Sequence, residues 1–254
     1  ISWLSELERT RRTQTVEAVG GIMNGPCNYI LDSMTRLGQD YAEALAQAQK
    51  LGYAEANPTT DVEGIDTWHK VILSANIGFG ISLVPETVPV CGISKIKASD
   101  VENFNAKGLV CKLISTGKCK DGKVSAYVQP TLVPQGQPEA AVPSNYNLIT
   151  LVGSASGRMS FFGQGAGRYP TAHNVIQDCA DILAGKGFYS PYGGKVSACN
   201  EDQLSYYVSG VCDSWLEENK QEAWGNAIVT KPVSVTQMHA WLKNNPDAFI
   251  AAIL

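Results

Sequence analysis

Polar and apolar positions alternate with two different periods along the chain, and these periods predict both strands and helices. Residues 15–19 alternate polar and apolar side chains, as a half-buried strand does. Residues 24–38 open with Asn-Gly-Pro and close with a glycine, which predicts a helix with a capping asparagine. A capping aspartate and a terminal glycine predict a second helix over 40–52. The charged residues 1–14 predict a leading helix or a frayed arm.

The middle of the chain predicts one long helix followed mainly by strands. Apolar positions predict a helix from Val62 to Phe79. Asp121-Gly122 predicts the turn of a hairpin between two longer strands. Further strands are predicted over 92–96, 147–152 and 158–163, and a helix over 170–183.

A stretch rich in Gly, Ser and Tyr at 185–200 predicts a boundary between two units. We therefore expect one domain over residues 1–186 and a second over 187–254. The second is predicted to contain strands over 204–209, 227–230 and 248–254, with helices over 212–224 and 235–244.

The composition excludes several classes of protein. Hydrophobic residues make up 44% of the chain and charged residues 17%, which is an ordinary globular composition. The net charge of −4 does not indicate a nucleic-acid partner. No apolar run approaches the roughly 20 residues that a membrane-spanning helix needs. Seven cysteines without C-x-x-C spacing predict reduced thiols, so we expect a cytoplasmic protein with no bound metal.

The densest group of charged side chains lies in GYAEANPTTDVEGIDTWHKV, residues 52–71. On a helix Asp66 and Lys70 are four positions apart, about 40° around the axis, and share one face. Apolar positions on both sides of Lys70 predict a buried helix, so the ammonium needs a partner, and Asp66 can be that partner. Such an ammonium can also donate to a reacting oxygen or hold a carboxylate. A purely structural Asp–Lys pair fits the pattern equally well.

Two further segments combine a turn with a helix start. GQGAGRYPTAH at 163–173 leads from a strand through a glycine-rich turn into a helix N-terminus, where backbone N–H groups can approach an acceptor or an anion. It fails the dinucleotide pattern G-x-G-x-x-G because Arg168 stands at the last glycine. GGIMNGPCNYIL at 20–31 is a strand end followed by a capped helix. Taken alone, each segment also fits an ordinary tight junction.

Together, GIMNGPCNYIL, AQKLGYAEANPTTDVEGIDTWHK and GQGAGRYPTA resemble, in this order, the motifs of homoserine dehydrogenases. The similarity covers roughly residues 15–183, and the middle motif is long and mixed in character. The resemblance implies NAD(P)-dependent interconversion of L-homoserine and L-aspartate 4-semialdehyde in threonine, methionine and isoleucine biosynthesis. It also implies an α+β fold with a mixed, largely antiparallel sheet covered by helices.

The resemblance gives roles to the matching positions. Lys70 matches the lysine that acts on the substrate oxygen, as proton donor in reduction, and we take it with Asp66 as the catalytic pair. The matching substrate-binding positions are Glu55, Asp61, Tyr53 and Asn24, with Glu55 holding the substrate ammonium. The turn Gly165-Ala166-Gly167 matches backbone that closes on the nicotinamide end of the cofactor.

The resemblance has two departures and one gap. Pro26 stands where the family usually has Thr, so a hydroxyl contact to substrate is lost, and Asn57 stands where Asp is common. The Rossmann domain that would bind most of NADP or NAD is expected before residue 1. We therefore expect these 254 residues alone to bind NADPH weakly and to turn over poorly.

Assembly and regulation follow from the same resemblance. The family implies a homodimer or a tetramer formed through the sheet. The element order after residue 200 resembles an ACT domain that lacks its first strand, so we expect a small ferredoxin-like unit with an amino-acid effector. The alternative is a non-catalytic amino-acid-binding or oligomerisation module derived from this family, which would keep the carboxylate pocket without a cofactor.

Overall fold

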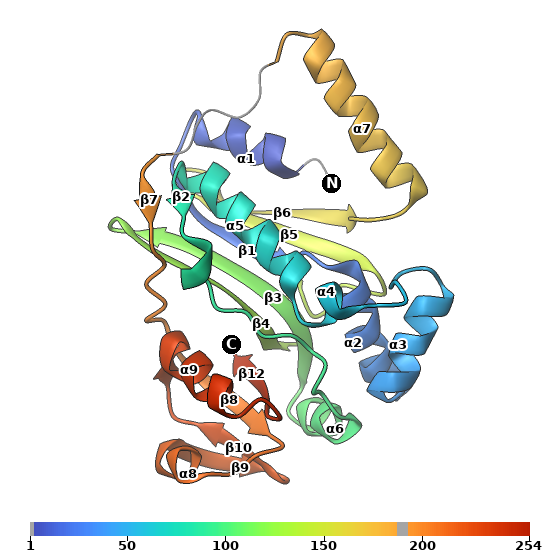
Figure 1. Ribbon diagram of the computed structural model, residues 1–254, viewed down its shortest axis with the longest axis vertical. Helices are drawn as coiled ribbons and strands as arrows, with labels where there is room; N and C mark the ends of the chain where they lie inside the picture. The colour runs from blue at the N-terminus through green and yellow to red at the C-terminus, as the bar shows by residue number, and fades with distance from the viewer. Residues whose placement is uncertain (1–2, 187–192) are drawn as a thin grey trace.

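The computed structural model describes residues 3–186 and 193–254, and one mixed sheet runs through them (Figure 1). Its strands are β1 (Val16–Ile22), β3 (Leu109–Lys120), β4 (Lys123–Pro134), β5 (Tyr146–Gly153), β6 (Gly157–Gln164), β8 (Gln203–Ser209), β9 (Lys220–Trp224), β10 (Ala227–Thr230), β11 (Val233–Ser234) and β12 (Phe249–Ile253). Their order is β6-β5-β1-β3-β4-β12-β8-β10-β9, with β11 beside β8. Among the described strands of this sheet every pair is antiparallel except β12 and β4.

The helices are α1 (Trp3–Arg11), α2 (Gly25–Leu37), α3 (Tyr41–Lys50), α4 (Thr59–Val62), α5 (Ile65–Phe79), α6 (Ala98–Ala106), α7 (Arg168–Leu183), α8 (Ser214–Asn219) and α9 (Val235–Asn244), with a 3₁₀ turn at Pro85–Thr87. A short parallel pair joins β2 (Ser82–Leu83) to β7 (Lys195–Val196). The prediction of a largely antiparallel sheet covered by helices is confirmed. The division at residue 186 stays a prediction, and it falls next to residues outside the described ranges.

The predicted helix caps are confirmed by their hydrogen bonds. Asn24 caps α2, with its side-chain oxygen accepting from the backbone N–H of Cys27. Asp40 and Glu43 form a reciprocal capping box at α3. These short-range signals fix where α2 leaves β1, and that junction carries part of the site.

The predicted helix over 62–79 is wrong only at its start, because α5 begins at Ile65 and Val62 is the last residue of the separate short helix α4. Gly64 separates the two with φ of +78°, a conformation that glycine adopts at little cost. On one continuous helix Asp61 and Asp66 would point about 140° apart, since five residues turn the helix by one full turn plus that angle. The break lets both carboxylates reach the same neighbour, as described below.

Two other predictions are wrong, and one helix was not predicted. Residues 92–96 form no strand in the structure, because the backbone there bonds to α4, with Ile93 N–H donating to the Val62 carbonyl at 2.7 Å. The predicted helix over 212–224 ends at Asn219, and Lys220–Trp224 pairs with β10 instead. Helix α6 was not predicted, because its apolar positions Val101 and Phe104 are too few to give a clear period.

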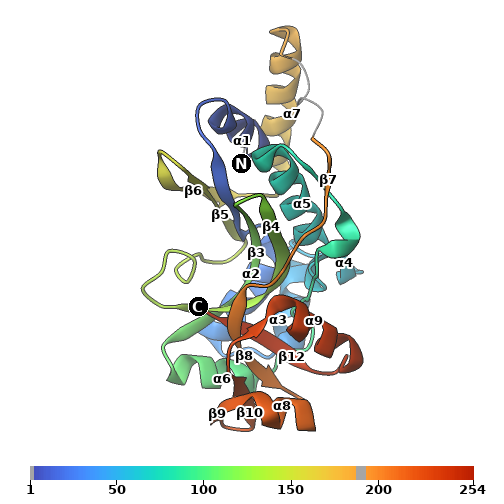
Figure 2. The same ribbon diagram turned by 90° about the vertical axis from the view of Figure 1, so that its left-hand side faces the viewer.

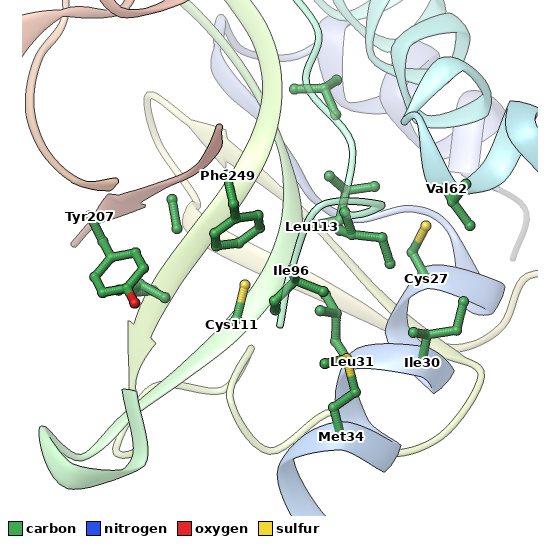
Figure 3. Close-up of a cluster of buried hydrophobic side chains, with 14 of the residues drawn as sticks. Cys27, Ile30, Leu31, Met34, Val62, Ile96, Cys111, Leu113, Tyr207 and Phe249 are labelled. Atoms are coloured by element: carbon green, nitrogen blue, oxygen red, sulfur yellow. The ribbon is translucent and has the colours of Figure 1, made fainter. Parts of the chain in front are cut away.

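The main core lies between the sheet and helices α2, α5 and α6. Figure 3 shows α2 presenting Cys27, Ile30, Leu31 and Met34 toward Cys111 and Leu113 of β3. Tyr207 and Phe249 of the C-terminal strands belong to the same cluster. The residues that follow 193 therefore share a core with the first part of the chain.

Helix α7 and one face of the sheet have little cover. In both views α7 stands apart from the sheet, and none of its residues is buried (Figures 1 and 2). Figure 2 shows α5 on one side of β1, β3 and β4, whereas no helix of the described residues covers the opposite side of β6, β5 and β1. On that side Phe162 is 58% exposed.

Candidate functional site

Asn24, between β1 and α2, holds three groups together through one side-chain amide. Its Oδ1 accepts from Cys27 N–H at 2.9 Å and so caps α2. Its Nδ2 donates to Asp61 Oδ1 at 2.7 Å and to Asp66 Oδ2 at 2.9 Å. The side chain is buried, so these bonds are shielded from water. One amide therefore fixes two carboxylates that come from different helices.

Lys70 on α5 extends this cluster with a cation. Its Nζ donates to Asp66 Oδ2 at 2.6 Å and to the Met23 carbonyl at 3.0 Å. An ammonium has three N–H donors, so these two contacts leave a third for a ligand oxygen. The side chain is 45% exposed, and Leu73 beside it is exposed to the same degree. The prediction of burial on both flanks of Lys70 is therefore wrong, because this face of α5 borders a cavity rather than the core.

Negative charge is concentrated on the other side of Lys70. Burial raises the pKa of Asp61, while the hydrogen bond from Asn24 opposes this rise and the charge of Asp66 adds to it. Glu55 contributes to the same rise in pKa, which places its carboxylate within electrostatic range of Asp61. A cationic group entering here would relieve the repulsion among these carboxylates.

Tyr53 and Glu55 lie in the loop that follows α3, beside the cluster rather than within it. The Tyr53 ring packs edge-on against Tyr29, with ring centroids 5.1 Å apart. The Gln49 side-chain amide donates to the Glu55 carbonyl at 3.0 Å, so the backbone of this loop is anchored to α3. The carboxylate of Glu55 and the hydroxyl of Tyr53 have no hydrogen bond to Asn24, Asp61, Asp66 or Lys70 among the described residues.

A cavity of about 220 Å³ begins at Lys70 and runs away from the carboxylates. Residues from four elements line it: Trp3 and Leu4 of α1, Leu73 and Ser74 of α5, Asn147 and Ile149 of β5, and Asn174 of α7, together with Met23 and Gly165. Helix α1 is held against α5 because Trp3 Nε1 donates to Ser74 Oγ at 2.8 Å. Lys70 thus stands between an acidic cluster and a largely apolar cavity.

The structure brings only part of the glycine-rich turn to this cavity. Gly165 lines it, and a Cβ added there would overlap the side chain of Asn147. Ala166 and Gly167 follow on an exposed turn that leads into α7, and neither lines the cavity. Gly167 has φ of +122°, which favours glycine at the start of the helix.

Two contributors to the site were missed in the sequence. The Met23 carbonyl accepts from Lys70, but a backbone group carries no side-chain signal. Asn147 is 3% exposed on β5, and its Oδ1 has no hydrogen-bond partner among the described residues. Asn147 lies on the same inward face of β5 as Ile149 and Leu151. The sequence could have indicated it, because a polar residue stands where the alternation along this strand calls for an apolar one.

Cys27 touches the cluster without serving as a nucleophile. Its Sγ donates to the Asp61 carbonyl at 3.1 Å, which ties α2 to α4. Burial raises the pKa of this thiol well above its usual range, and the neighbouring Asp61 adds to the rise. The group is therefore a neutral thiol, which is a poor nucleophile.

Both departures from the family motif are accommodated locally. Pro26 lies in the first turn of α2, where its missing N–H costs nothing. Asn57 Oδ1 accepts from Thr59 Oγ1 at 2.7 Å, so the amide still provides the acceptor that an aspartate would. Within 3–186 and 193–254 no group of three or more His, Cys, Asp or Glu side chains is arranged to hold a metal ion.

The homoserine dehydrogenase family model matches residues 3–180. The chain is 42% identical over 185 residues to the homoserine dehydrogenase of Corynebacterium glutamicum and 38% identical over 180 residues to that of Bacillus subtilis. Each match covers 71% of this chain and 42% of the relative, so the chain spans about two-fifths of the length of these curated relatives.

Some solved structures match a larger share of the chain. A homoserine dehydrogenase of Staphylococcus aureus superposes with a TM-score of 0.72 at 28% identity, over 95% of this chain and 66% of that one. One from Thiobacillus denitrificans has a TM-score of 0.79 at 24% identity, over 99% of this chain and 67% of that one, which supports the fold. These matches extend beyond residue 186. The chain belongs to the homoserine dehydrogenase family.

Proposed function

We propose that this chain supplies the substrate-binding and proton-transferring half of an NAD(P)-dependent homoserine dehydrogenase, which interconverts L-homoserine and L-aspartate 4-semialdehyde. The observation that carries this proposal is the Lys70 ammonium, held by Asp66 and the Met23 carbonyl at the boundary between carboxylates and an apolar cavity. Such a boundary suits a small substrate with an ammonium at one end and a reacting oxygen at the other.

In this proposal the carboxylates bind and Lys70 carries the proton. The substrate ammonium lies against Glu55 and Asp61, whose mutual repulsion it relieves. Lys70 Nζ donates its remaining hydrogen bond to the carbonyl oxygen of the semialdehyde and gives that proton to the oxygen as the hydroxyl forms. Asp66 keeps the ammonium oriented, and Asn24 keeps Asp66 in place.

The residues around the cavity fit a nicotinamide ring. Gly165 brings backbone close to Asn147, Leu73 and Ile149 offer apolar surface, and Asn147 Oδ1 is a buried acceptor with no partner among the described residues. When bound, the reduced ring of NADPH or NADH would supply the hydride that reduces the semialdehyde. Leu73 and Ile149 exclude water from the face of the ring, and Lys70 stays within reach of the substrate oxygen.

The test compares two amino acids that differ by one hydroxyl group. We expect the chain to bind homoserine more tightly than L-2-aminobutyrate, measured by NMR titration, because only homoserine offers an oxygen to Lys70. Lys70→Met should remove this preference, whereas Lys50→Met, an exposed lysine on α3, should keep it. Equal binding of both ligands by the unmodified chain would remove Lys70 from substrate recognition. Homoserine binding without NAD(P)-dependent turnover, in the protein that carries these residues, would favour the non-catalytic binding module.

We also propose that the chain forms a homodimer or tetramer through the face of β6, β5 and β1 that no described helix covers. Tyr146 and Phe162 stack on this face with ring centroids 5.1 Å apart, and Phe162 remains 58% exposed. An exposed aromatic pair on a sheet face is typical of a buried surface between subunits.

An amino-acid effector at the C-terminal unit stays a proposal supported by one cavity. A hollow of about 510 Å³ lies between α6 and the strands β8 and β10. None of its lining residues lines the cavity at Lys70, so a ligand there would not compete directly with substrate. Across the described residues no helix is both long and apolar enough to cross a bilayer.

A further inference from the structure

Asn147 of β5 is a buried amide that takes no part in the proposed proton transfer. It is 3% exposed and lies in the wall of the cavity at Lys70, opposite Gly163 of β6. Its Nδ2 faces the Met23 carbonyl at 3.5 Å, and Oδ1 has no partner among the residues that the structure describes. A buried amide oxygen without a hydrogen bond costs roughly 1–3 kcal/mol, so a ligand that donates to it would recover that cost.

The orientation of this amide follows from its neighbour. The Met23 carbonyl accepts from Lys70 Nζ at 3.0 Å, and it can only accept, so it attracts the NH₂ end of Asn147 rather than the oxygen. The oxygen is thereby turned away from Met23. The Met23 carbonyl therefore contacts Lys70 and also sets the direction in which Asn147 Oδ1 can accept a hydrogen bond.

The chemistry of the surroundings selects the kind of donor. The carboxylates that could hold an ammonium lie on the other side of Lys70, around Asp61. On the cavity side the lining that includes Asn147 is largely apolar, and its other members are Trp3, Leu4, Met23, Lys70, Leu73, Ser74, Ile149, Gly165 and Asn174. A second ammonium would be repelled by Lys70 there, whereas a neutral amide N–H on a flat aromatic ring can lie against apolar side chains.

We propose that Asn147 Oδ1 accepts a hydrogen bond from the carboxamide N–H of the nicotinamide ring, and so sets which way round the ring lies in the cavity. This rests on the proposed function. Gly165 is required beside it, because a side chain there would overlap Asn147 Nδ2 and push the whole amide out of this orientation. The carboxamide is the only substituent that distinguishes the two edges of the ring, so one acceptor is enough to fix its orientation relative to Lys70.

The test uses two ligands that differ in this donor. Nicotinamide mononucleotide carries the carboxamide, whereas its 3-acetylpyridine analogue keeps the carbonyl and replaces the NH₂ by a methyl group. Binding of each to the 254-residue chain is followed by NMR titration, with the side-chain amide resonance of Asn147 as a local reporter. We expect the nicotinamide nucleotide to bind about three- to tenfold more tightly, as one net hydrogen bond allows. We also expect it alone to shift the Asn147 resonance strongly.

Asn147→Leu should abolish this preference by weakening only the nicotinamide nucleotide. Because the unmodified chain already gives the ratio of the two affinities, the inference is decided even if the variant folds poorly. Equal binding of both nucleotides by the unmodified chain, no binding of either, or a preference that survives in Asn147→Leu would overturn it. A homoserine titration of the same samples separates the two proposals. If homoserine binding depends on Lys70 but the two nucleotides bind equally, the role of Asn147 is contradicted and the proposed function is not.

Discussion

His239 on α9 should make the stability of the fold depend on pH between about 6.5 and 4. The side chain is 6% exposed, and its Nε2 contacts Gln129 Oε1 of β4 at 3.0 Å. Burial lowers the pKa of His239 to about 4, and the nearby Lys243 adds to this. The pKa in the unfolded chain is about 6.5. As pH falls through this range the unfolded chain takes up a proton that the folded chain does not, so the free energy of unfolding decreases.

The magnitude follows from the two pKa values. A difference of one pKa unit corresponds to about 1.36 kcal/mol. The free energy of unfolding should fall by roughly 3 kcal/mol in total, a loss that is complete below about pH 4. Between pH 7 and pH 5 it should fall by about 2 kcal/mol. That is a large share of the roughly 5–15 kcal/mol that stabilises a typical domain.

The assay is urea unfolding followed by tryptophan fluorescence, because Trp241 lies on the same helix and stacks on Trp215. His239→Gln keeps a side chain that can hydrogen-bond to Gln129 but cannot titrate. Between pH 7 and pH 5 its free energy of unfolding should therefore fall by about 2 kcal/mol less than that of the unmodified chain. His173→Gln, an exposed histidine on α7, is the matched control and should behave as the unmodified chain does. If His239→Gln and the unmodified chain lose stability in parallel, burial of a neutral His239 is wrong.

Three further predictions concern other parts of the molecule. Burial lowers the pKa of Lys112 to about 8. As pH rises from about 8 to 10.5, the free energy of unfolding of the unmodified chain should therefore increase by up to about 3 kcal/mol relative to that of Lys112→Met. Urea unfolding that gives the same pH dependence for both proteins would contradict this. Asn24→Ser keeps a helix cap but loses the amide donors to the carboxylates of Asp61 and Asp66. Homoserine affinity in an NMR titration should therefore fall about tenfold, while the free energy of unfolding falls by less than about 1 kcal/mol. Unchanged affinity would show that Asn24 does not position the two carboxylates. Phe162→Glu should convert a dimer into a monomer in analytical ultracentrifugation, and an unchanged sedimentation coefficient would exclude the β6 face as the interface.

Local signals in the sequence predicted the elements whose form is decided by neighbouring residues. Asn24 and Asp40 cap their helices because each side chain reaches a backbone N–H three residues away. Asp121 and Gly122 make the predicted hairpin turn, with φ of 50° and 74°. In these cases the partner is close in sequence, so a pattern of a few residues contains the whole interaction.

The errors lie where a distant partner decides the structure. Gly64 fits a helical period, yet it breaks the helix where its backbone packs against Val90 and Cys91. Residues 220–224 continue an apparent helix until β10 offers backbone partners. Gly92 lies so close to the backbone of Val62 that no side chain fits, which holds 92–96 against α4 as a loop.

The candidate site was predictable in part for the same reason. The pair Asp66 and Lys70 follows from helical spacing, and its ion pair is present at 2.6 Å. The bridge through Asn24 joins residues about 40 positions apart, and only the folded chain shows it. Asn147 is more distant still, and its unpaired oxygen has meaning only after Lys70 and Met23 are in place.

In the proposed mechanism Lys70 exchanges a proton with the substrate oxygen: its ammonium donates the proton in reduction, and its amine accepts the proton in oxidation. The most direct measurement is homoserine oxidation with NAD(P), followed by nicotinamide absorbance, in the protein that carries these residues and in its Lys70→Met variant. We expect the turnover rate to fall by roughly 10²- to 10⁴-fold, the usual contribution of a positioned proton carrier, with the urea-unfolding midpoint nearly unchanged because this side chain is 45% exposed. A folded Lys70→Met variant with turnover within about tenfold of the unmodified protein would contradict the assignment.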